Sequence, residues 1–356
     1  MRHPVPRTGL AAGLLALALL GAACGSGSSA GPAKTAGGRV AAPVALRLGY
    51  FPNLTHATAI AGVEKGFFAD KLGPGVQLKT SLFNAGPAAV EALFSDALDA
   101  TYIGPNPAIN AFVKSNGAAV RIVAGATSGG ALLVVKPTVA GAADLKGRTI
   151  ASPQLGNTQD VALRTWLAAQ GLKTETSGGG DVHVAPQDNA QALEAFKSGA
   201  IAGAWEPEPW ATRMVQEGGG KVLVDERSLW PGGQFVTTQL LVRTAYLQAH
   251  PDVIERLVEG HVAATDYLNA KPAEARGVVN AGIAKLTGKA LPDAVVTAAW
   301  NNLTFTVDPV AASLRQGAAN AQTAGLLDKS VKLDGIYDLT ILDRVLGRLH
   351  RPAVKV

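Results

Sequence analysis

Short apolar runs alternate with amphipathic stretches along most of the chain after residue 44, which is the pattern of strands and helices that follow one another. A first set of strands is predicted at Leu46–Tyr50, Gln77–Leu82, Ala100–Ile103 and Val120–Ala124, with helices over His56–Lys65, Pro87–Ser95 and Pro107–Ser115. A second set is predicted at Thr149–Ala151, Asp181–Val184, Ala202–Trp205 and Lys221–Val224, with helices that begin near Asn157, Asn189 and Pro209. Such alternation predicts α/β sheets built mainly from parallel strands with right-handed crossovers.

Two sets of this kind predict two lobes, because about 310 residues are more than a single core usually holds. The apolar segments Ala131–Val135 and Gln239–Val242 lie between the sets, and we interpret them as the two crossovers that join the lobes. From Thr244 onward the pattern is mostly helical, and we expect this part to pack on the first lobe. The predicted boundaries are 44–131 plus 239–356 for lobe 1 and 132–238 for lobe 2.

The N-terminus has the pattern of an export signal. Arg2 and Arg7 precede an apolar run from Leu10 to Ala23, which is shorter than the ~20 residues of a membrane span. This run ends in LGAAC at Cys24, which resembles a bacterial lipoprotein cleavage box, with glycine where an aliphatic residue is usual.

We therefore predict a signal peptide over residues 1–23, a lipid on Cys24 and a flexible tether rich in glycine, serine and alanine over 24–43. The alternative is an ordinary signal peptide with an incidental cysteine. Because Cys24 is the only cysteine, no disulfide can form within the chain. The localisation expected from these features is extracytoplasmic, at the cell membrane through the lipid.

Charge and motif content exclude several classes of function. The formal net charge of +5 is spread along the chain without a basic cluster, so nucleic acid is not an expected partner. No phosphate-binding GxxxxGK[ST] loop, HExxH motif or cysteine pair occurs, and the six histidines are scattered. We expect no metal, no cofactor and no catalytic residues; Asp181 and His183 are the nearest approach to a ligand cluster.

The loops that follow the predicted strands are rich in glycine, proline, asparagine and threonine. They span residues 49–56, 83–87 and 104–107 in the first set and 152–158, 186–189 and 205–209 in the second. Parallel strands place such loops at one edge of a sheet, so two facing edges predict a ligand cleft. Helix starts there have unpaired N–H groups and a partial positive charge, which favours an anion without any arginine.

Each residue type in these loops has a function at such a cleft and also a simpler structural role. Glycines allow close backbone approach, asparagines and threonines donate hydrogen bonds but also cap helices, and aromatic rings can form walls or core. The aromatic candidates are Phe51, Phe83, Tyr102, Trp205 and Trp210. Glu206 and Glu208 stand at a helix start; directed into the cleft, they would prefer an amine or N–H donor to a bare anion.

The chain resembles the substrate-binding proteins of bacterial importers for aliphatic sulfonates, taurine and nitrate, a group that extends to binding proteins for thiamine-pyrimidine precursors. The resemblance is carried by "GYFPNLTHATA", "FNAGPAAVEAL", "ALDATYIGPNPAI", "DLKGRTIASPQLGNTQDVALRTWL", "AWEPEPWATRMVQEGG" and "HPDVIERLV", in that order. It implies a two-lobed periplasmic-binding-protein fold, with mixed, mainly parallel sheets flanked by helices and two hinge crossovers. Glu206, where relatives are more usually apolar, and Asp96-Ala97, where glycine is more typical, depart from the pattern.

The resemblance also implies a set of ligand-binding positions. They are Asn53, Thr55, His56, Asn84, Ala85, Gly86, Gly104, Asn106, Gly156, Asn157, Thr158, Trp205, Glu208, Thr237 and Thr238.

We therefore predict a monomeric lipoprotein that captures a small organic anion, such as an aliphatic sulfonate or taurine, and delivers it to an ABC permease with its ATPase subunit. The alternatives are a binding protein for a pyrimidine, thiamine precursor or other nitrogenous solute, and an enzyme or a ligand sensor on the same fold.

Overall fold

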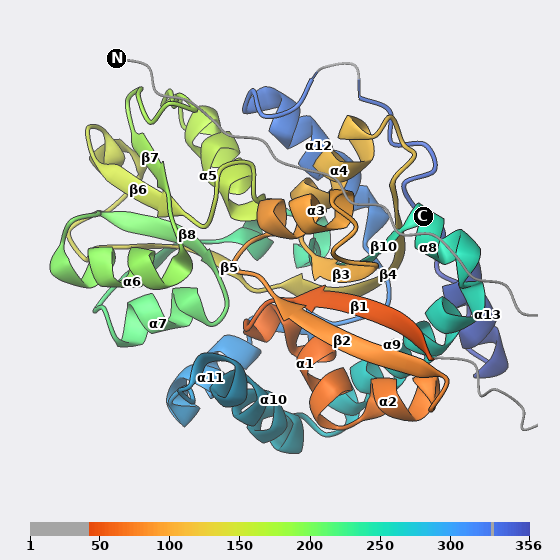
Figure 1. The fold of residues 1–356 in the computed structure, drawn as a ribbon. Coiled ribbons are helices and arrows are strands. Elements are labelled where there is room, and N and C mark those ends of the chain that lie inside the picture. The colour runs from red at the N-terminus through yellow and green to blue at the C-terminus, as the bar shows by residue number, and fades with distance from the viewer. Residues whose placement is uncertain (1–42, 329–330) are drawn as a thin grey trace, which may run out of the picture. The chain divides into compact units, whose positions relative to one another are not determined.

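The computed structural model describes residues 43–328 and 331–356, which lie in one compact unit built around two β-sheets (Figure 1). The predicted signal peptide, Cys24 and the tether lie outside the described residues. Within the described ranges, no helix combines the length and the apolar character needed to cross a membrane.

The first sheet has six strands, and its centre is formed by segments far apart in the sequence. In spatial order they are β11 (Leu303–Phe305), β4 (Val120–Gly129), β10 (Val236–Arg243), β3 (Ala100–Ile103), β1 (Val44–Tyr50) and β2 (Val76–Leu82). Strand β1 pairs in parallel with β2 and β3, whereas β10 is antiparallel to β3 and β4, and β11 is antiparallel to β4.

The second sheet has five strands. Their order is β7 (His183–Pro186), β6 (Thr149–Ser152), β8 (Gly203–Pro207), β5 (Ala131–Val135) and β9 (Lys221–Asp225). Strand β6 is parallel to β7 and β8, and β5 is antiparallel to β8 and β9. In both sheets most strands share one direction, which confirms the predicted α/β class.

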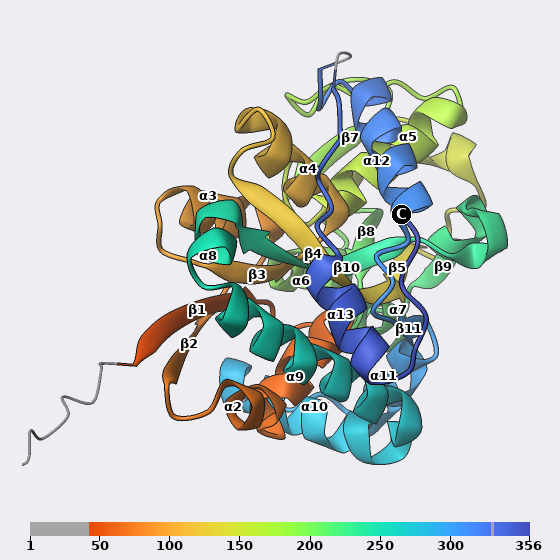
Figure 2. The same cartoon turned by 90° about the vertical axis from the view of Figure 1, so that its right-hand side faces the viewer.

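Helices cover both faces of the first sheet and bury two separate cores (Figures 1 and 2). One core holds residues of α1 (Ala57–Glu64), α2 (Phe67–Leu72), α8 (Thr244–Ala249), α9 (Pro251–Ala270), α10 (Pro272–Thr287), α11 (Asp293–Trp300) and α13 (Thr340–Arg348). The other holds residues of α3 (Gly86–Phe94), α4 (Pro105–Lys114) and α12 (Ala311–Thr323). The helical C-terminal part thus packs on the first sheet. The short helix α2 was not predicted from the sequence.

The second sheet is sandwiched in the same way. Leu163 and Leu167 of α5 (Thr158–Ala169) pack on one face together with Trp205. Helices α6 (Asn189–Ser198) and α7 (Trp210–Gln216) cover the opposite face through Phe196 and Met214. The central strands β5 and β8 are therefore buried on both sides, which explains the continuous apolar run of β5, whereas the edge strands β7 and β9 are partly exposed.

The two segments interpreted as crossovers are sheet strands: β5 lies inside the second sheet and β10 in the middle of the first. The chain passes between the sheets beside them, first at Gly129-Gly130 and then through the short 3-10 turns η3 (Glu226–Leu229) and η4 (Pro231–Gly233). Ala131, the first residue of β5, lies in the second sheet, and Val236, the first residue of β10, lies in the first sheet. The predicted boundaries place these two residues in the opposite lobes; the exact boundaries between the lobes remain a prediction. Both segments are apolar because both are central or doubly covered strands.

Gly125 in β4 packs directly against another backbone segment, which leaves no space for a side chain. A Cβ there would lie 2.1 Å from the Asp308 carbonyl oxygen and 2.7 Å from the Pro309 nitrogen, both of them backbone atoms. We expect Gly125→Ala to lower the free energy of unfolding by about 2–3 kcal/mol, as measured by urea denaturation.

The matched control is Gly75→Ala, because nothing lies within 4 Å of a Cβ at that exposed glycine. It should change the free energy of unfolding by less than about 0.5 kcal/mol. Equal losses in the two variants would show that Asp308 and Pro309 move aside.

Candidate functional site

Loops from both sheets meet around a small cavity with a volume of about 20 Å³. The cavity brings together nine of the residues predicted from the sequence: Asn53, Thr55, His56, Asn84, Gly104, Asn157, Thr158, Thr237 and Thr238. It also includes Phe51, Pro153, Gln159, Asn189 and Pro207. Phe51 was expected as an aromatic wall; Pro153, Asn189 and Pro207 fall in the predicted loops, and Gln159 follows Thr158 in the first turn of α5.

Six predicted positions lie outside the lining of this cavity, and three of them support the loops around it. Gly86 and Ala85 begin α3, where Gly86 packs so tightly on Pro107 that a Cβ would lie 2.3 Å from its Cγ. Gly156 has a φ of +74° and donates its N–H to Asp160 Oδ2 at 2.9 Å. These residues shape the edge of the cavity without contributing to its surface.

The other three have partners elsewhere. The Asn106 Nδ2 donates to the Gly317 carbonyl at 3.1 Å. The Trp205 indole is fully buried and donates to Glu226 Oε2 at 2.8 Å. The Glu208 carboxylate accepts hydrogen bonds from Thr212 Oγ1 at 2.8 Å and from Asn302 Nδ2 at 2.7 Å. Glu208 therefore anchors the start of α7 to the turn after α11.

Strand β8 explains why the structure separates Trp205 from the cavity. The sequence predicted a loop from residue 205, but β8 continues to Pro207. Alternation along a strand directs Trp205 toward the core beneath α5, and Glu206 toward α6 and α7.

On the side of the first sheet, Phe51 and His56 form a stacked pair with ring centroids 4.2 Å apart. The His56 Nδ1 accepts a hydrogen bond from the Phe51 N–H at 3.4 Å, and the ring is buried. Burial lowers the pKa of His56 to about 3, so the imidazole is neutral at physiological pH. His56 therefore offers an N–H donor but no positive charge.

On the side of the second sheet, the start of α5 provides the polar groups. Asn157 is the N-cap residue, and Thr158 and Gln159 form the first turn, whose N–H groups have no acceptor within the helix. The buried hydroxyl groups of Thr158 and, on β10, Thr238 have no hydrogen-bond partner in the described part of the protein. Unpaired buried hydroxyls are costly, which makes them strong candidates for ligand contacts.

Asp160 fixes the first turn of α5 to the residues that precede it. Its buried carboxylate accepts hydrogen bonds from Ser152 Oγ at 2.9 Å and from the Arg164 Nε at 3.1 Å, as well as from the Gly156 N–H. Because one carboxylate fixes strand end, loop and helix, the first turn of α5 presents a rigid surface to the cavity.

Direct contacts cross the cavity and hold its two sides together. The Trp210 Nε1 donates to Asn53 Oδ1 at 2.9 Å, and the Thr55 N–H donates to the Glu208 carbonyl at 3.4 Å. Gly104 lies so close to Thr158 that a Cβ on the glycine would be 2.3 Å from the Thr158 Oγ1. The arrangement is a closed one, with room for about one water molecule.

The surface of the cavity carries no formal charge: its polar side chains are amides, hydroxyls and the neutral His56. Glu206 lies behind this surface and is fully buried; with the Asn189 amide nitrogen facing it, Asn189 donates to Glu206 Oε2 at 3.1 Å. Burial raises the pKa of Glu206 well above its ordinary value. Asn189 lines the cavity and Glu206 does not, so this carboxyl group does not itself face a bound solute.

The two sheets, their flanking helices and the cavity between their loops define the two-lobed periplasmic-binding-protein fold. The chain belongs to the NMT1-like family, whose model matches residues 40–284. No group of three or more histidine, cysteine or acidic side chains with the arrangement of a metal site occurs in residues 43–328 and 331–356.

Several bacterial relatives of the chain are named as binding proteins. A binding protein of Brucella abortus is 27% identical over 292 residues, covering 81% of this chain and 85% of the relative. The taurine-binding periplasmic protein of Escherichia coli is 26% identical over 58% of this chain and 61% of its own length. A Bacillus subtilis protein named for binding aliphatic sulfonates is 25% identical over 69% of this chain and 70% of its own length.

Solved structures share the fold. The alkanesulfonate-binding protein of Xanthomonas axonopodis pv. citri, bound to MOPS, superimposes with a TM-score of 0.68 at 23% identity and covers 82% of this chain and 96% of its own. The periplasmic nitrate-binding protein of Synechocystis has a TM-score of 0.69 at 17% identity, with 86% and 89% covered.

Proposed function

We propose that this protein is an extracytoplasmic solute-binding protein that captures a small organic anion of the sulfonate or taurine type and delivers it to an ABC permease. The observation that carries the proposal is the uncharged, donor-rich surface between the two sheets. It is built from residues at the starts of α4, α5 and α6, together with Thr55, Thr237 and Thr238. Helix N-termini and neutral donors stabilise an anion without a cationic side chain.

The names of the taurine-binding and sulfonate-binding relatives support this class of ligand. A sulfonate group has three acceptor oxygens and no donor, so it suits a site whose hydroxyls of Thr158 and Thr238 have no other partner. His56 adds a neutral N–H donor, and Phe51 provides an apolar wall for a short carbon chain.

We propose a hinge mechanism for uptake. A cavity of about 20 Å³ is too small for any organic solute, so the lobes separate to admit the ligand and then enclose it. The hinges proposed are Gly129-Gly130 and the η3–η4 segment, where the chain passes between the sheets. Ligand contacts from both lobes stabilise the closed form, which the permease then recognises. Cys24, if lipidated as its sequence context predicts, keeps the protein near that permease.

A second candidate ligand is a pyrimidine or thiamine precursor. The amides of Asn53, Asn84, Asn157 and Asn189 and of Gln159 offer donors and acceptors together, which suits a nitrogen heterocycle. Phe51, stacked on His56, could extend the stack onto a planar ring.

A thermal-shift screen of the purified protein distinguishes the two ligand classes. The compounds are taurine, alkanesulfonates, nitrate, bicarbonate and pyrimidine precursors. A sulfonate at ~100 times its dissociation constant should stabilise the folded state by ~2.7 kcal/mol. Stabilisation only by pyrimidine compounds would assign the site to the second candidate, and no stabilisation by any of them would contradict both.

A further inference from the structure

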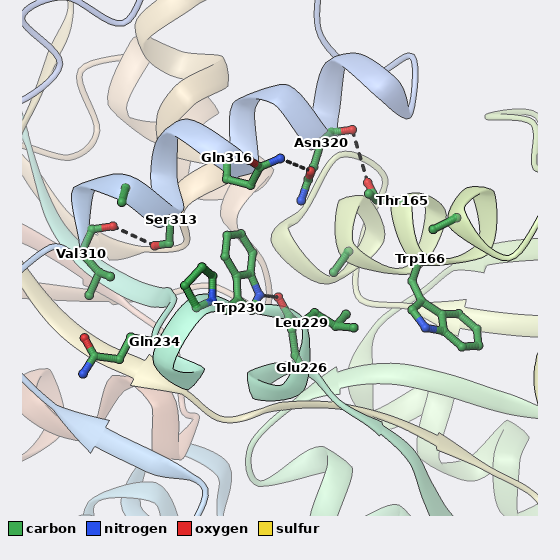
Figure 3. Close-up of a pocket in the computed structure, with 14 residues that line it drawn as sticks. Thr165, Trp166, Glu226, Leu229, Trp230, Gln234, Val310, Ser313, Gln316 and Asn320 are labelled. Carbon is green, nitrogen blue, oxygen red and sulfur yellow. Dashed lines mark hydrogen bonds between the residues drawn. The ribbon is translucent and has the colours of Figure 1, made fainter.

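A second, much larger cavity lies on one side of the protein, between α5 and α12 and above the η3–η4 segment (Figure 3). Its volume is about 660 Å³, which falls within the range of small-molecule sites. Its surface is mostly apolar, with uncharged polar groups from Thr165, Gln316 and Asn320 at the rim.

Two tryptophan rings form the aromatic part of this cavity, and each is fixed from behind. Trp230 stacks on Phe235 with ring centroids 5.6 Å apart and an interplanar angle of 14°. Trp166 packs edge-on against Trp205 at 6.2 Å. The rings are therefore already in place for a ligand, and ordering them adds little to the entropic cost of binding.

Glu226 is the only ionisable side chain among the residues that line the cavity. It is 2% exposed, and its oxygens accept hydrogen bonds from the Trp205 Nε1 at 2.8 Å and from the Trp230 Nε1 at 3.3 Å. Two indole N–H donors occupy only part of the lone pairs of the carboxylate, and because indole is neutral they do not compensate its negative charge. The neighbouring Arg227 pairs with Asp225 at 2.6 Å instead.

Burial without a counter-charge is unfavourable for the ionised form of Glu226 and raises its pKa to about 7. A ligand with a positive charge would provide the missing partner. The carboxylate lies at the N–H edges of Trp205 and Trp230, so a cation beside it would also lie close to the aromatic rings of the cavity. Aromatic rings attract organic ammonium groups through their electron-rich faces.

This cavity is separate from the one between the loops. The space that lies between them has a volume of about 20 Å³ and is lined by Thr158, which faces the first cavity, and by Glu226 and Trp230, which face the second. It has room for about one water molecule, so an organic solute cannot pass from one cavity to the other in this arrangement.

We propose that the cavity around Glu226, Trp230 and Trp166 is a second binding site, which takes an organic cation with an apolar body, such as an alkyl- or arylammonium compound. The cation contacts the carboxylate and the indole rings, and its apolar part lies along Leu229 and Val310. Because α5 packs on the second sheet and α12 on the first, the bound cation touches both halves of the protein.

The test uses the complete protein and the probe benzyltrimethylammonium, with benzyl alcohol and benzenesulfonate as the uncharged and anionic comparisons. Binding is followed by quenching of tryptophan fluorescence and by calorimetry. We expect the cation to bind at least ten times more tightly than benzyl alcohol. Equal affinities for cation and alcohol, or no response to the cation at concentrations up to about 10 mM, would overturn the proposal.

Two variants locate the site. Glu226→Gln should weaken cation binding at least tenfold, whereas the exposed Glu194→Gln on α6, where the glutamate pairs with Lys197, should leave it unchanged. Ala312→Phe fills the cavity from an exposed position on α12 and should abolish cation binding without affecting folding. Because Ala312 does not line the cavity between the loops, this variant should keep any sulfonate response. Cation binding that survives Ala312→Phe would overturn the proposal even if Glu226→Gln fails to fold.

Discussion

Gly104→Ala is expected to weaken binding of the solute that the screen identifies by about 100-fold, while the free energy of unfolding changes by less than about 0.5 kcal/mol. The added Cβ would lie 2.3 Å from the Thr158 Oγ1, a contact made only when the loops of the two sheets meet. Thr158 is β-branched and lies in the first turn of α5, so its side chain has little freedom to move away. Overpacking of this kind costs about 1–3 kcal/mol, and each 1.4 kcal/mol corresponds to a factor of ten in affinity.

The backbone of Gly104 makes this substitution a clean test of closure. Its φ of −70° and ψ of 162° suit any residue, so alanine adds volume without backbone strain. Affinity is measured by calorimetry and the open-to-closed ratio by small-angle scattering. Gly141→Ala, where nothing lies within 4 Å of a Cβ, is the control and should bind normally.

A double-mutant cycle identifies the cause of the loss. In a Thr158→Ala background the Oγ1 is gone and the nearest remaining side-chain atom is the Cβ at 3.4 Å, so Gly104→Ala should have little further effect. An equal loss of affinity in both backgrounds would show that Gly104 acts on the ligand directly and that closure against Thr158 is not the reason.

Ionisation of Glu226 should lower the free energy of unfolding by up to ~3 kcal/mol as the pH rises from about 4.5 to about 7. The buried histidines His56 and His261, whose pKa values burial lowers, contribute in the opposite direction, so this effect is read from the difference between the wild type and a Glu226 variant. The pKa of Glu226 is raised to about 7 in the folded state by burial, against 4.5 when exposed. Between these values the folded state holds a proton that the unfolded state lacks. Its contribution to stability is therefore complete below pH 4.5 and lost as the pH passes 7. Burial also raises the pKa values of Glu206 and Glu208, which extends the loss in the same direction.

Urea unfolding of the wild-type protein and of Glu226→Gln at pH 5 and pH 8 isolates this contribution. The variant side chain cannot ionise, so from pH 5 to pH 8 the free energy of unfolding of the wild type should change by ~2.5 kcal/mol more, in the destabilising direction, than that of the variant. The amide nitrogen in Glu226→Gln cannot accept the hydrogen bond from one indole N–H, which lowers the free energy of unfolding of the variant by about 1 kcal/mol. This loss is the same at both pH values, so it does not affect the comparison of the two pH profiles. Glu194→Gln, at the surface beside Lys197, should follow the wild-type profile. An equal pH dependence in Glu226→Gln and wild type would contradict the prediction.

The local pattern of the sequence predicted most elements of the fold because each strand and helix has its own periodicity. The position of β10 could not be predicted in this way, because its place between β3 and β4 depends on pairing with residues more than a hundred positions earlier. The short helix α2 was missed because six residues give little periodicity, and its Phe68 and Leu72 are recognised as core only in the folded protein.

At the candidate site, the residues at helix starts were brought together as the sequence suggested, since the ends of parallel strands share an edge. Trp205 and Glu208 were not, for a reason of register. Strand β8 ends two residues later than predicted, and alternation then directs the indole into the core. The Glu208 carboxylate is hydrogen-bonded to Asn302, which lies 94 residues later in the sequence, so this contact could not be predicted from the local sequence.

The position of β10 also imposes an order on synthesis of the protein. All strands of the second sheet lie between residues 131 and 225, so that sheet can form as soon as this stretch has been made. The first sheet stays open between β3 and β4 until residues 236–243 arrive, and the helices from α8 to α13, which complete its cover, come later still. The lobe that begins first in the sequence is therefore completed last, and until then edges of β3 and β4 stay unpaired and exposed to any chaperone or protease that meets the nascent chain.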